Sequence, residues 1–309
     1  MHDASLLGQD WVLILQRARR QRTEHLRGWA SGGPARLASA LLATNGPRVR
    51  VGLVVLAIFG LIKAGHDGGH SATVMVAICL ASVISSIAGF AFSAICGAIL
   101  FHFHDDPVQI VQIMIVCSIA NQASMTWASR HDIAWRGLRV YLLGGAPGLA
   151  IGVWILLNMD RGLYAHGFGA ALLLYGVYML VRKPFVVRHP PVALDLLAGF
   201  LGGITGGAAG FPGAFVTIWC GMKGWSKARQ RAVFQPFILS MQVAALLAIS
   251  LLRPAGTGMP GFDIANLLFV PASLAGTWAG LALYGRMSDL QFGRAVNLLL
   301  IASGLSYVV

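Results

Sequence analysis

Two segments of this chain carry glycines, hydroxyl residues and a phenylalanine in an arrangement that could bind an anion. Glycines permit a tight reversal and a close approach of the backbone to a solute. The helix that leaves such a turn starts with unpaired N–H groups carrying about half a positive charge. Two such helix starts would attract an anion without a buried cation, and hydroxyl groups would add donors. The candidate binding residues are Ser85, Ser86, Gly89 and Phe90 in the first segment and Thr205, Gly206, Gly207, Gly210 and Phe211 in the second.

Further polar residues follow on the helices expected after each segment. Asn121, Gln122 and Gln242 could add amide donors, although hydrogen bonds between helices explain them equally well. Arg231 could attract or gate an anion, although the orientation of the chain in a membrane explains it without a binding role. Close helix packing is the alternative explanation for the glycines, but two such segments in one chain favour the binding role.

The chain that must position these residues has the composition of an integral membrane protein. Of its 309 residues, 57% are apolar and 11% are charged, against about 45–50% and about 25% in a soluble domain. Its apolar runs provide for roughly seven to nine membrane passages. The predicted fold class is therefore an all-α polytopic membrane protein. The runs cover residues 51–64, 72–103, 107–128, 138–158, 164–181, 192–221, 232–252, 264–284 and 290–309.

Two of these runs, 72–103 and 192–221, are too long to be single straight helices. The second would span about 45 Å, whereas the hydrocarbon layer is about 30 Å thick. Both runs contain one of the glycine-rich segments, which supplies a break. We therefore expect each run to form a re-entrant helical hairpin. Its turn must face protein or a water-filled cavity, because non-helical backbone cannot face lipid.

The two long runs also align with each other at an offset of 121 residues. Residues 80–90 (LASVISSIAGF) match residues 201–211 (LGGITGGAAGF) in Leu, Ala, Gly and Phe. The chain therefore holds two copies of one unit, residues 71–183 and 192–309, each with one hairpin and three transmembrane helices. An extra helix at residues 51–64 precedes them. Downstream matches pair Gln109 with Gln230, Asn121 with Gln242, Pro147 and Gly152 with Pro271 and Gly276, and Gly176 with Gly304.

Basic residues are concentrated on one side of the expected membrane segments. The N-terminal tail and alternate loops carry 20 of the 23 Lys and Arg residues, and the positive-inside rule places that side in the cytoplasm. Both ends of 192–221 are then cytoplasmic and both ends of 72–103 periplasmic, so the two copies are inverted. In this architecture, transporters bind solutes between broken helices near the middle of the membrane.

The first 50 residues differ from the transporter domain expected at 51–309. They carry eight Arg residues, and their apolar residues recur at helical spacing, which fits a basic amphipathic helix on the cytoplasmic membrane surface. A tail that only sets topology fits equally well. The net charge of +12 follows from this orientation and from anionic lipid, so we expect no nucleic-acid partner.

No catalytic or metal-binding motif accompanies these features. The sequence contains no HExxH, GxSxG or Walker-type motif. Its four cysteines lie in apolar runs without the spacing of zinc ligands. A cluster formed by His102, His104, Asp105 and Asp106 is better explained as a surface loop. We expect no enzymatic activity, no bound metal and no cofactor.

The two glycine-rich segments resemble those of the sulfite exporter TauE/SafE family of membrane permeases. The sequences that carry the resemblance are SIAGFAFSAICGAILFHF and GGITGGAAGFPGAFVTIWCGMKGWSKARQRAVFQPF, and it extends over residues 71–309. It implies that the glycine-rich turn includes Gly206, Gly207 and Gly210 with Pro212, and that Arg231 is the basic position. Ser85 and Ser86 depart from the family pattern, since many members carry glycines there.

The resemblance implies transport of small sulfur-containing anions, such as sulfite or an organosulfonate, across a bacterial inner membrane. We expect a secondary transporter that works by alternating access around the hairpin tips, with export as the expected direction and a cytoplasmic N-terminus. The alternatives are a permease for another carboxylate or sulfonate, and a non-transporting membrane sensor or assembly subunit. The expected partners are the small anion and the lipid bilayer, and a homodimer is left open.

Overall fold

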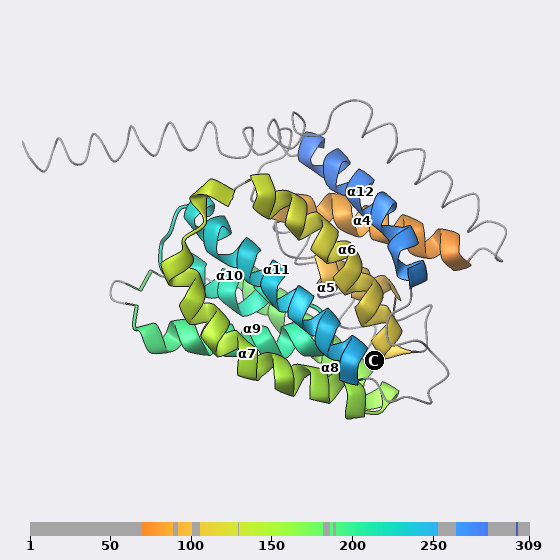
Figure 1. The fold of residues 1–309 in the computed structure, drawn as a ribbon, viewed down its shortest axis with the longest axis horizontal. Coiled ribbons are helices and arrows are strands. Elements are labelled where there is room, and N and C mark those ends of the chain that lie inside the picture. Colours follow the sequence, from red (N-terminus) through yellow and green to blue (C-terminus); the bar gives the residue numbers. More distant parts are fainter. Residues whose placement is uncertain are drawn as a thin grey trace, which may run out of the picture. The chain divides into compact units, whose positions relative to one another are not determined.

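Every regular element in the described part of the chain is a helix (Figure 1). The computed structural model describes residues 70–88, 92–100, 106–128, 130–181, 186–187, 190–252, 264–283 and 301. All of them belong to one of the two units into which the chain divides, Asn45–Val309. The longer helices are α4 (His70–Ala88), α5 (Phe92–Leu100), α6 (Pro107–Ala128), α7 (Trp135–Asn158), α8 (Arg161–Val181), α9 (Val192–Ala209), α10 (Gly213–Met222), α11 (Lys227–Leu252) and α12 (Val270–Leu283), with two short 3-10 helices, η1 (Arg130–Asp132) and η2 (Ile264–Phe269).

Several expectations concern residues outside this described part. They are the basic segment 1–50, the extra helix at 51–64, the last run at 290–309 apart from residue 301, the candidate site residues Gly89 and Phe90, and His102, His104 and Asp105 of the polar cluster. Asp106, the last member of that cluster, is described. It accepts a hydrogen bond from the backbone N–H of Val108 at 2.9 Å and so caps the start of α6.

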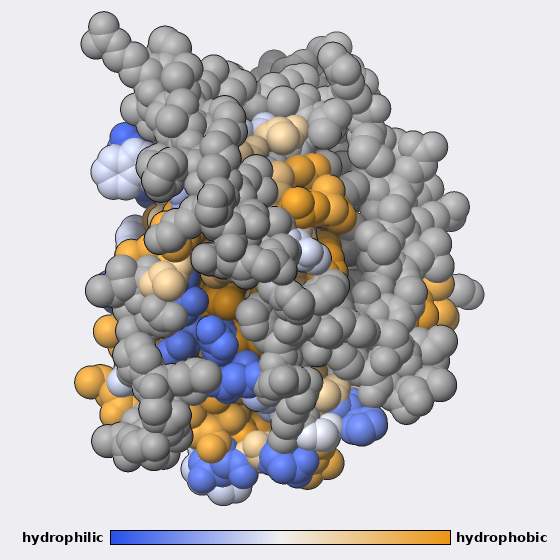
Figure 2. All heavy atoms as spheres, turned by 90° about the vertical axis from the view of Figure 1, so that its right-hand side faces the viewer, coloured by the Kyte–Doolittle hydropathy of each residue, from blue (hydrophilic) through white to orange (hydrophobic). Residues whose placement is uncertain are grey.

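Within the described residues, four helices are long and apolar enough to cross a membrane: Pro107–Trp127, Trp135–Asn158, Val192–Ala209 and Arg229–Leu252. Large apolar side chains are also exposed along α7 and α8, including Leu143, Trp154 and Leu174. On the face drawn in Figure 2, a group of hydrophilic residues lies between hydrophobic ones. Because exposed apolar surface on this scale is unfavourable in water, lipid is its natural environment. The chain is a polytopic helical membrane protein, as its composition predicts.

The run at 192–221 is broken between α9 and α10. Gly210 has a left-handed backbone conformation with φ of 62°, which a residue with a side chain rarely adopts. The chain then reverses, so that α10 packs along α9. A Cβ atom on Gly202 would lie 2.7 Å from the carbonyl oxygen of Pro212. The glycines of α9 thus allow α10 to lie close against it.

A largely buried polar cluster joins α9 and α10 at the end of the pair that lies away from the turn. Asp195, in the first turn of α9, accepts hydrogen bonds from Trp219 at the end of α10 (2.5 Å) and from Tyr141 of α7 (2.9 Å). The same carboxylate oxygen lies 2.5 Å from the ammonium nitrogen of Lys223, directly after α10. The start of α9 and the end of α10 therefore lie side by side.

Long-range packing pairs helices from the two halves of the chain. Helix α7 packs most extensively against α9, α12 packs against α4, and α6 packs against α11. In the first pair, glycines recur every fourth residue on both helices. A Cβ atom on Gly148 would lie 2.1 Å from the carbonyl oxygen of Phe200, and one on Gly203 would lie 2.2 Å from that of Gly145. The two backbones are in direct contact, which only glycine permits.

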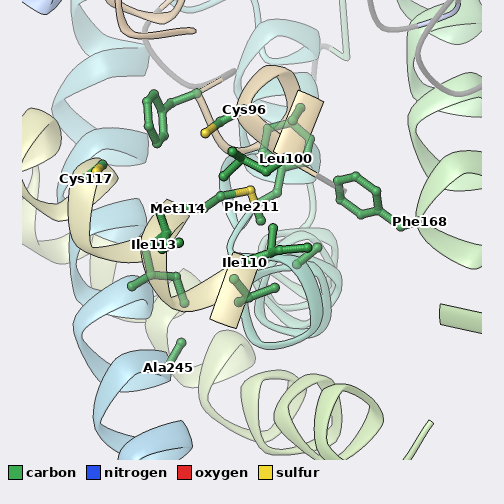
Figure 3. Close-up of a cluster of buried hydrophobic side chains, with 14 of the residues drawn as sticks. Cys96, Leu100, Ile110, Ile113, Met114, Cys117, Phe168, Phe211 and Ala245 are labelled. Atoms are coloured by element: carbon green, nitrogen blue, oxygen red, sulfur yellow. The ribbon is translucent and has the colours of Figure 1, made fainter. Parts of the chain in front are cut away.

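The hydrophobic core surrounds the α9–α10 turn. Figure 3 shows Cys96 and Leu100 of α5, Met114 of α6, and Phe168 of α8 gathered around Phe211 of the turn. The Phe211 ring also meets the ring of Tyr175 edge-on, with 5.6 Å between ring centroids. This packing anchors the turn inside the protein rather than at its surface.

Candidate anion site at the turn between α9 and α10

The two glycine-rich segments meet at the carbonyl group of Gly210. The hydroxyl of Ser93, the second residue of α5, donates to this carbonyl oxygen at 2.6 Å. The side-chain amide of Gln242, from α11, donates to the same oxygen at 3.1 Å. Both side chains are buried. Residues from the first segment, the second segment and the following helix thus converge on one point.

Two backbone amides of the turn are already bonded to α9. The N–H of Gly210 donates to the carbonyl of Gly206 at 3.0 Å, and the N–H of Phe211 donates to that of Thr205 at 3.1 Å. This arrangement closes the C-terminus of α9. Pro212 has no N–H group, so the amides that could bind a solute here would be those of the first turn of α10, beginning at buried Gly213.

The start of α10 retains the features of an anion site. No side chain caps it within the described part of the chain, so its first N–H groups keep the partial positive charge of a helix N-terminus. The turn before it is fixed by the bonds at Gly210. A small anion would therefore be bound chiefly by the α10 amides, with Gly213 and Ala214 nearest the turn.

The hydroxyl groups expected to face the solute donate within their own helices. Ser86 donates to the carbonyl of Val83 at 2.8 Å, and Thr205 donates to that of Leu201 at 3.1 Å. Ser85 is buried in the same turn of α4 as Ser86. The hydroxyl protons of Ser86 and Thr205 therefore point along their own helices and not toward a shared site.

Gly206 and Gly207 have packing partners. A Cβ atom on Gly206 would lie 2.9 Å from the Cβ of Pro212, across the α9–α10 reversal. A Cβ atom on Gly207 would lie 2.5 Å from the carbonyl oxygen of Leu149 in α7. The packing role that the sequence left as an alternative applies to both glycines. Gly210 alone among the three combines the left-handed conformation with direct contacts to Ser93 and Gln242.

Asn121 belongs to a polar cluster that joins α4, α6 and α12. Its amide nitrogen donates to the hydroxyls of Ser273 at 2.8 Å and Ser82 at 3.3 Å. Its amide oxygen accepts from the hydroxyl of Thr277 at 2.9 Å. All groups of this amide are used in bonds between helices, which is the second of the two roles considered for it. Gln122, its neighbour in sequence, is also buried.

Gln242 is arranged differently from Asn121. Its amide nitrogen donates to the hydroxyl of Ser118 at 2.8 Å as well as to the Gly210 carbonyl. Its amide oxygen has no hydrogen-bond partner among the described residues, although the residue is only 1% exposed. The structure thus brings the amide group of Gln242 directly to the turn.

Arg231 lies away from the turn, near the beginning of α11. Eleven residues separate it from Gln242, which is about 16 Å along a helix. The neighbouring Ala232 carbonyl accepts a bond from the N–H of Ala134 before α7. The structure thus places this half-buried arginine near the start of α11, about three helical turns before the candidate site.

The sequence did not single out Ser93, Ser118 or Gln235, which take part in or lie near the site. Ser93 and Ser118 are buried serines that contact the turn or Gln242. Gln235 lies two turns before Gln242 on α11 and is fully buried. A signal for Gln235 was present, because two glutamines seven residues apart within an apolar run are costly in a membrane unless they serve a purpose. Nothing in the sequence distinguished the two serines from ordinary packing residues.

Comparison with known proteins identifies the family. The family model described as "Sulfite exporter TauE/SafE" matches residues 74–307, which include both glycine-rich segments and every described helix of the site. Searches of curated proteins and of solved structures gave no match. The matched region covers more than half of the chain and agrees with the resemblance of its two segments. The chain therefore belongs to the TauE/SafE family, a family of membrane transporters of sulfite and related anions.

Proposed function

We propose that this protein is a secondary transporter that exports a small sulfur-containing anion, such as sulfite or an organosulfonate, and binds it at the turn between α9 and α10. The observation that carries the proposal is the convergence of Ser93 and Gln242 on the Gly210 carbonyl beside the uncapped start of α10. Family membership supports the anionic substrate class. The substrate's negative charge would be stabilised by the first amides of α10.

Helix lengths support a re-entrant arrangement of α9 and α10. The ten residues of α10 rise only about 15 Å, half of the roughly 30 Å of a hydrocarbon layer. The contact of Lys223 with Asp195 brings both ends of the segment together. If α9 and α10 instead crossed the membrane as one span, Asp195 and Lys223 would be separated by the thickness of the bilayer.

Equivalent glycine contacts support an inverted repeat. In the α7–α9 pair, a Cβ atom on Gly148 would lie 2.1 Å from the Phe200 carbonyl oxygen; in the α12–α4 pair, one on Gly276 would lie 2.3 Å from that of Cys79. Cys79 and Phe200 are 121 residues apart, the offset of the two glycine-rich segments. By these contacts the counterpart of Gly276 is Gly148. The sequence alignment had paired Gly276 with Gly152, which lies one helical turn further along α7.

Alternating access would use this symmetry. Helix α7 of the first half packs on α9 of the second half, and α12 of the second half packs on α4 of the first. In inverted-repeat transporters, rocking of one bundle against the other exposes a central site to each side in turn. With the basic loops in the cytoplasm of a bacterial cell, export would carry the anion from the α9–α10 turn to the periplasm.

Replacing Gly210 tests the proposal, and Gly224 provides a matched control. Both have positive φ, 62° and 64°, so Gly210→Val and Gly224→Val impose similar backbone strain of about 1–3 kcal/mol. We expect sulfite flux into proteoliposomes to fall at least tenfold in Gly210→Val and to persist in Gly224→Val. Equal flux in the two variants, with equal membrane insertion, would contradict a site at the turn. A non-transporting sensor would give no flux in the unmodified protein.

A further inference from the structure

The unpaired amide oxygen of Gln242 is fixed in place. The carbonyl oxygen of Gly210 can only accept hydrogen bonds, so the amide nitrogen of Gln242 must face it. Turning the amide over would place two acceptor oxygens against each other. The Oε1 atom of Gln242 therefore stays on the other side, without a partner among the described residues. The turn that attracts an anion thus also presents an acceptor, which repels one.

The equivalent amide in the other half of the chain does not have an unpartnered oxygen. Asn121 precedes Gln242 by the repeat offset of 121 residues, and its amide oxygen is bonded to the hydroxyl of Thr277. Thr277 directly follows Gly276, and the residue that follows its counterpart Gly148 is Leu149, which has no hydroxyl group. The hydroxyl that bonds the Asn121 oxygen therefore has no counterpart at the position that would serve Gln242.

A second glutamine on α11 repeats the arrangement. The amide nitrogen of Gln235 points to the sulfur of Met125 on α6 at 3.5 Å, and its amide oxygen has no partner among the described residues. Gln235 and Gln242 are seven residues apart, as are their α6 partners Met125 and Ser118. Two amides with unpartnered oxygens, two helical turns apart on α11, therefore lie at its contact with α6.

A buried acceptor without a donor costs about 1–3 kcal/mol. A fully deprotonated oxyanion has only acceptors and cannot recover this cost, whereas an anion with its own O–H or N–H group can. We propose that the site selects anions that also carry a hydrogen-bond donor, with the negative group at the start of α10 and the donor bonded to Oε1 of Gln242. Hydrogensulfite supplies an O–H group, and taurine, a zwitterion, supplies an ammonium group beside its anionic sulfonate. This inference rests on the proposed function and narrows its substrate class.

Binding to the purified full-length protein tests the inference. Calorimetric titrations at one pH below the deprotonation of hydrogensulfite would compare hydrogensulfite, taurine and methanesulfonate, a monoanion of similar size without a donor. We expect methanesulfonate to bind at least about tenfold more weakly than the better of the other two, the effect of one such bond. Which of these two binds more tightly identifies the source of the donor.

Two variants test whether Gln242 causes this difference in affinity. In Gln242→Leu the difference between donor-bearing ligands and methanesulfonate should shrink to less than about threefold. In Ser250→Ala it should persist, because Ser250 lies on the same helix and its hydroxyl donates to the Leu246 carbonyl, away from Gln242. If the discrimination survives in Gln242→Leu, the assignment of Oε1 is overturned.

A pH series on the unmodified protein keeps the inference testable should Gln242→Leu fail to fold. Sulfite affinity should fall as pH rises through the deprotonation of hydrogensulfite, while methanesulfonate affinity should stay constant. Equal affinities for all three ligands at low pH, or a sulfite affinity that rises with pH, would overturn the donor requirement and leave the proposed function standing. If none of the three ligands binds, the proposed function itself is contradicted.

Discussion

At the scale of single residues, matched positions in the two halves of the chain have different roles. Asn121 uses its whole amide to join α4, α6 and α12, whereas the amide oxygen of Gln242 at the α9–α10 turn has no partner in the described part of the chain. The sequence identified both as candidate donors and could not separate them. The difference depends on Ser82, Ser273 and Thr277, of which the last two lie more than 150 residues away along the chain.

Replacing Asn121 with Ala should therefore reduce stability. Three hydrogen bonds between helices are lost, each worth about 0.6 kcal/mol in a membrane protein, or about 2 kcal/mol in total. Asn158→Ala provides a control, because Asn158 is exposed and bonds only within its own helix. Thermal unfolding in detergent should show a clear decrease for Asn121→Ala and almost none for Asn158→Ala. Similar unfolding temperatures for the two variants would show that the cluster adds no stability.

At the scale of helices, the break at Gly210 was predictable and the pairing of helices was not. The run at 192–221 exceeds the membrane thickness and contains glycines followed by Pro212, so its interruption follows from length and backbone chemistry. The contact of α7 with α9 depends on glycines at four-residue spacing, such as Gly148 and Gly203. Such spacing indicates that a helix packs closely, but it does not name the helix on which it packs.

Adding a methyl group to this contact tests it within one helix. In Gly148→Ala the new Cβ would lie 2.1 Å from the Phe200 carbonyl oxygen, whereas nothing lies within 4 Å of a Cβ on Gly137, also in α7. We expect Gly148→Ala to lower the free energy of unfolding by about 1–3 kcal/mol, because α7 and α9 must separate to admit the methyl group. Gly137→Ala should be neutral or stabilising by up to about 1 kcal/mol. Chemical unfolding in detergent would measure both, and an unaffected Gly148→Ala would mean that the helices pack more loosely.

At the scale of the whole molecule, the account depends on how the chain crosses the membrane. Composition, apolar runs and charge bias were sufficient to predict a polytopic helical membrane protein, because each is a property of the sequence alone. The meeting of the two glycine-rich segments at Gly210 was expected only in outline. The bonds that make it, from Ser93 and Gln242, depend on side-chain packing between distant parts of the chain.

The central claim is that α9 and α10 enter the membrane and return on the same side. Single cysteines placed at Pro190 and Ser226, on either side of this pair, test it in a variant whose four native cysteines are replaced. Labelling of intact cells and of inverted vesicles with a membrane-impermeant maleimide would show the side on which each cysteine lies. We predict that both are labelled only in inverted vesicles, because the proposed topology places both ends in the cytoplasm. Labelling of one cysteine in intact cells and of the other only in inverted vesicles would contradict the claim.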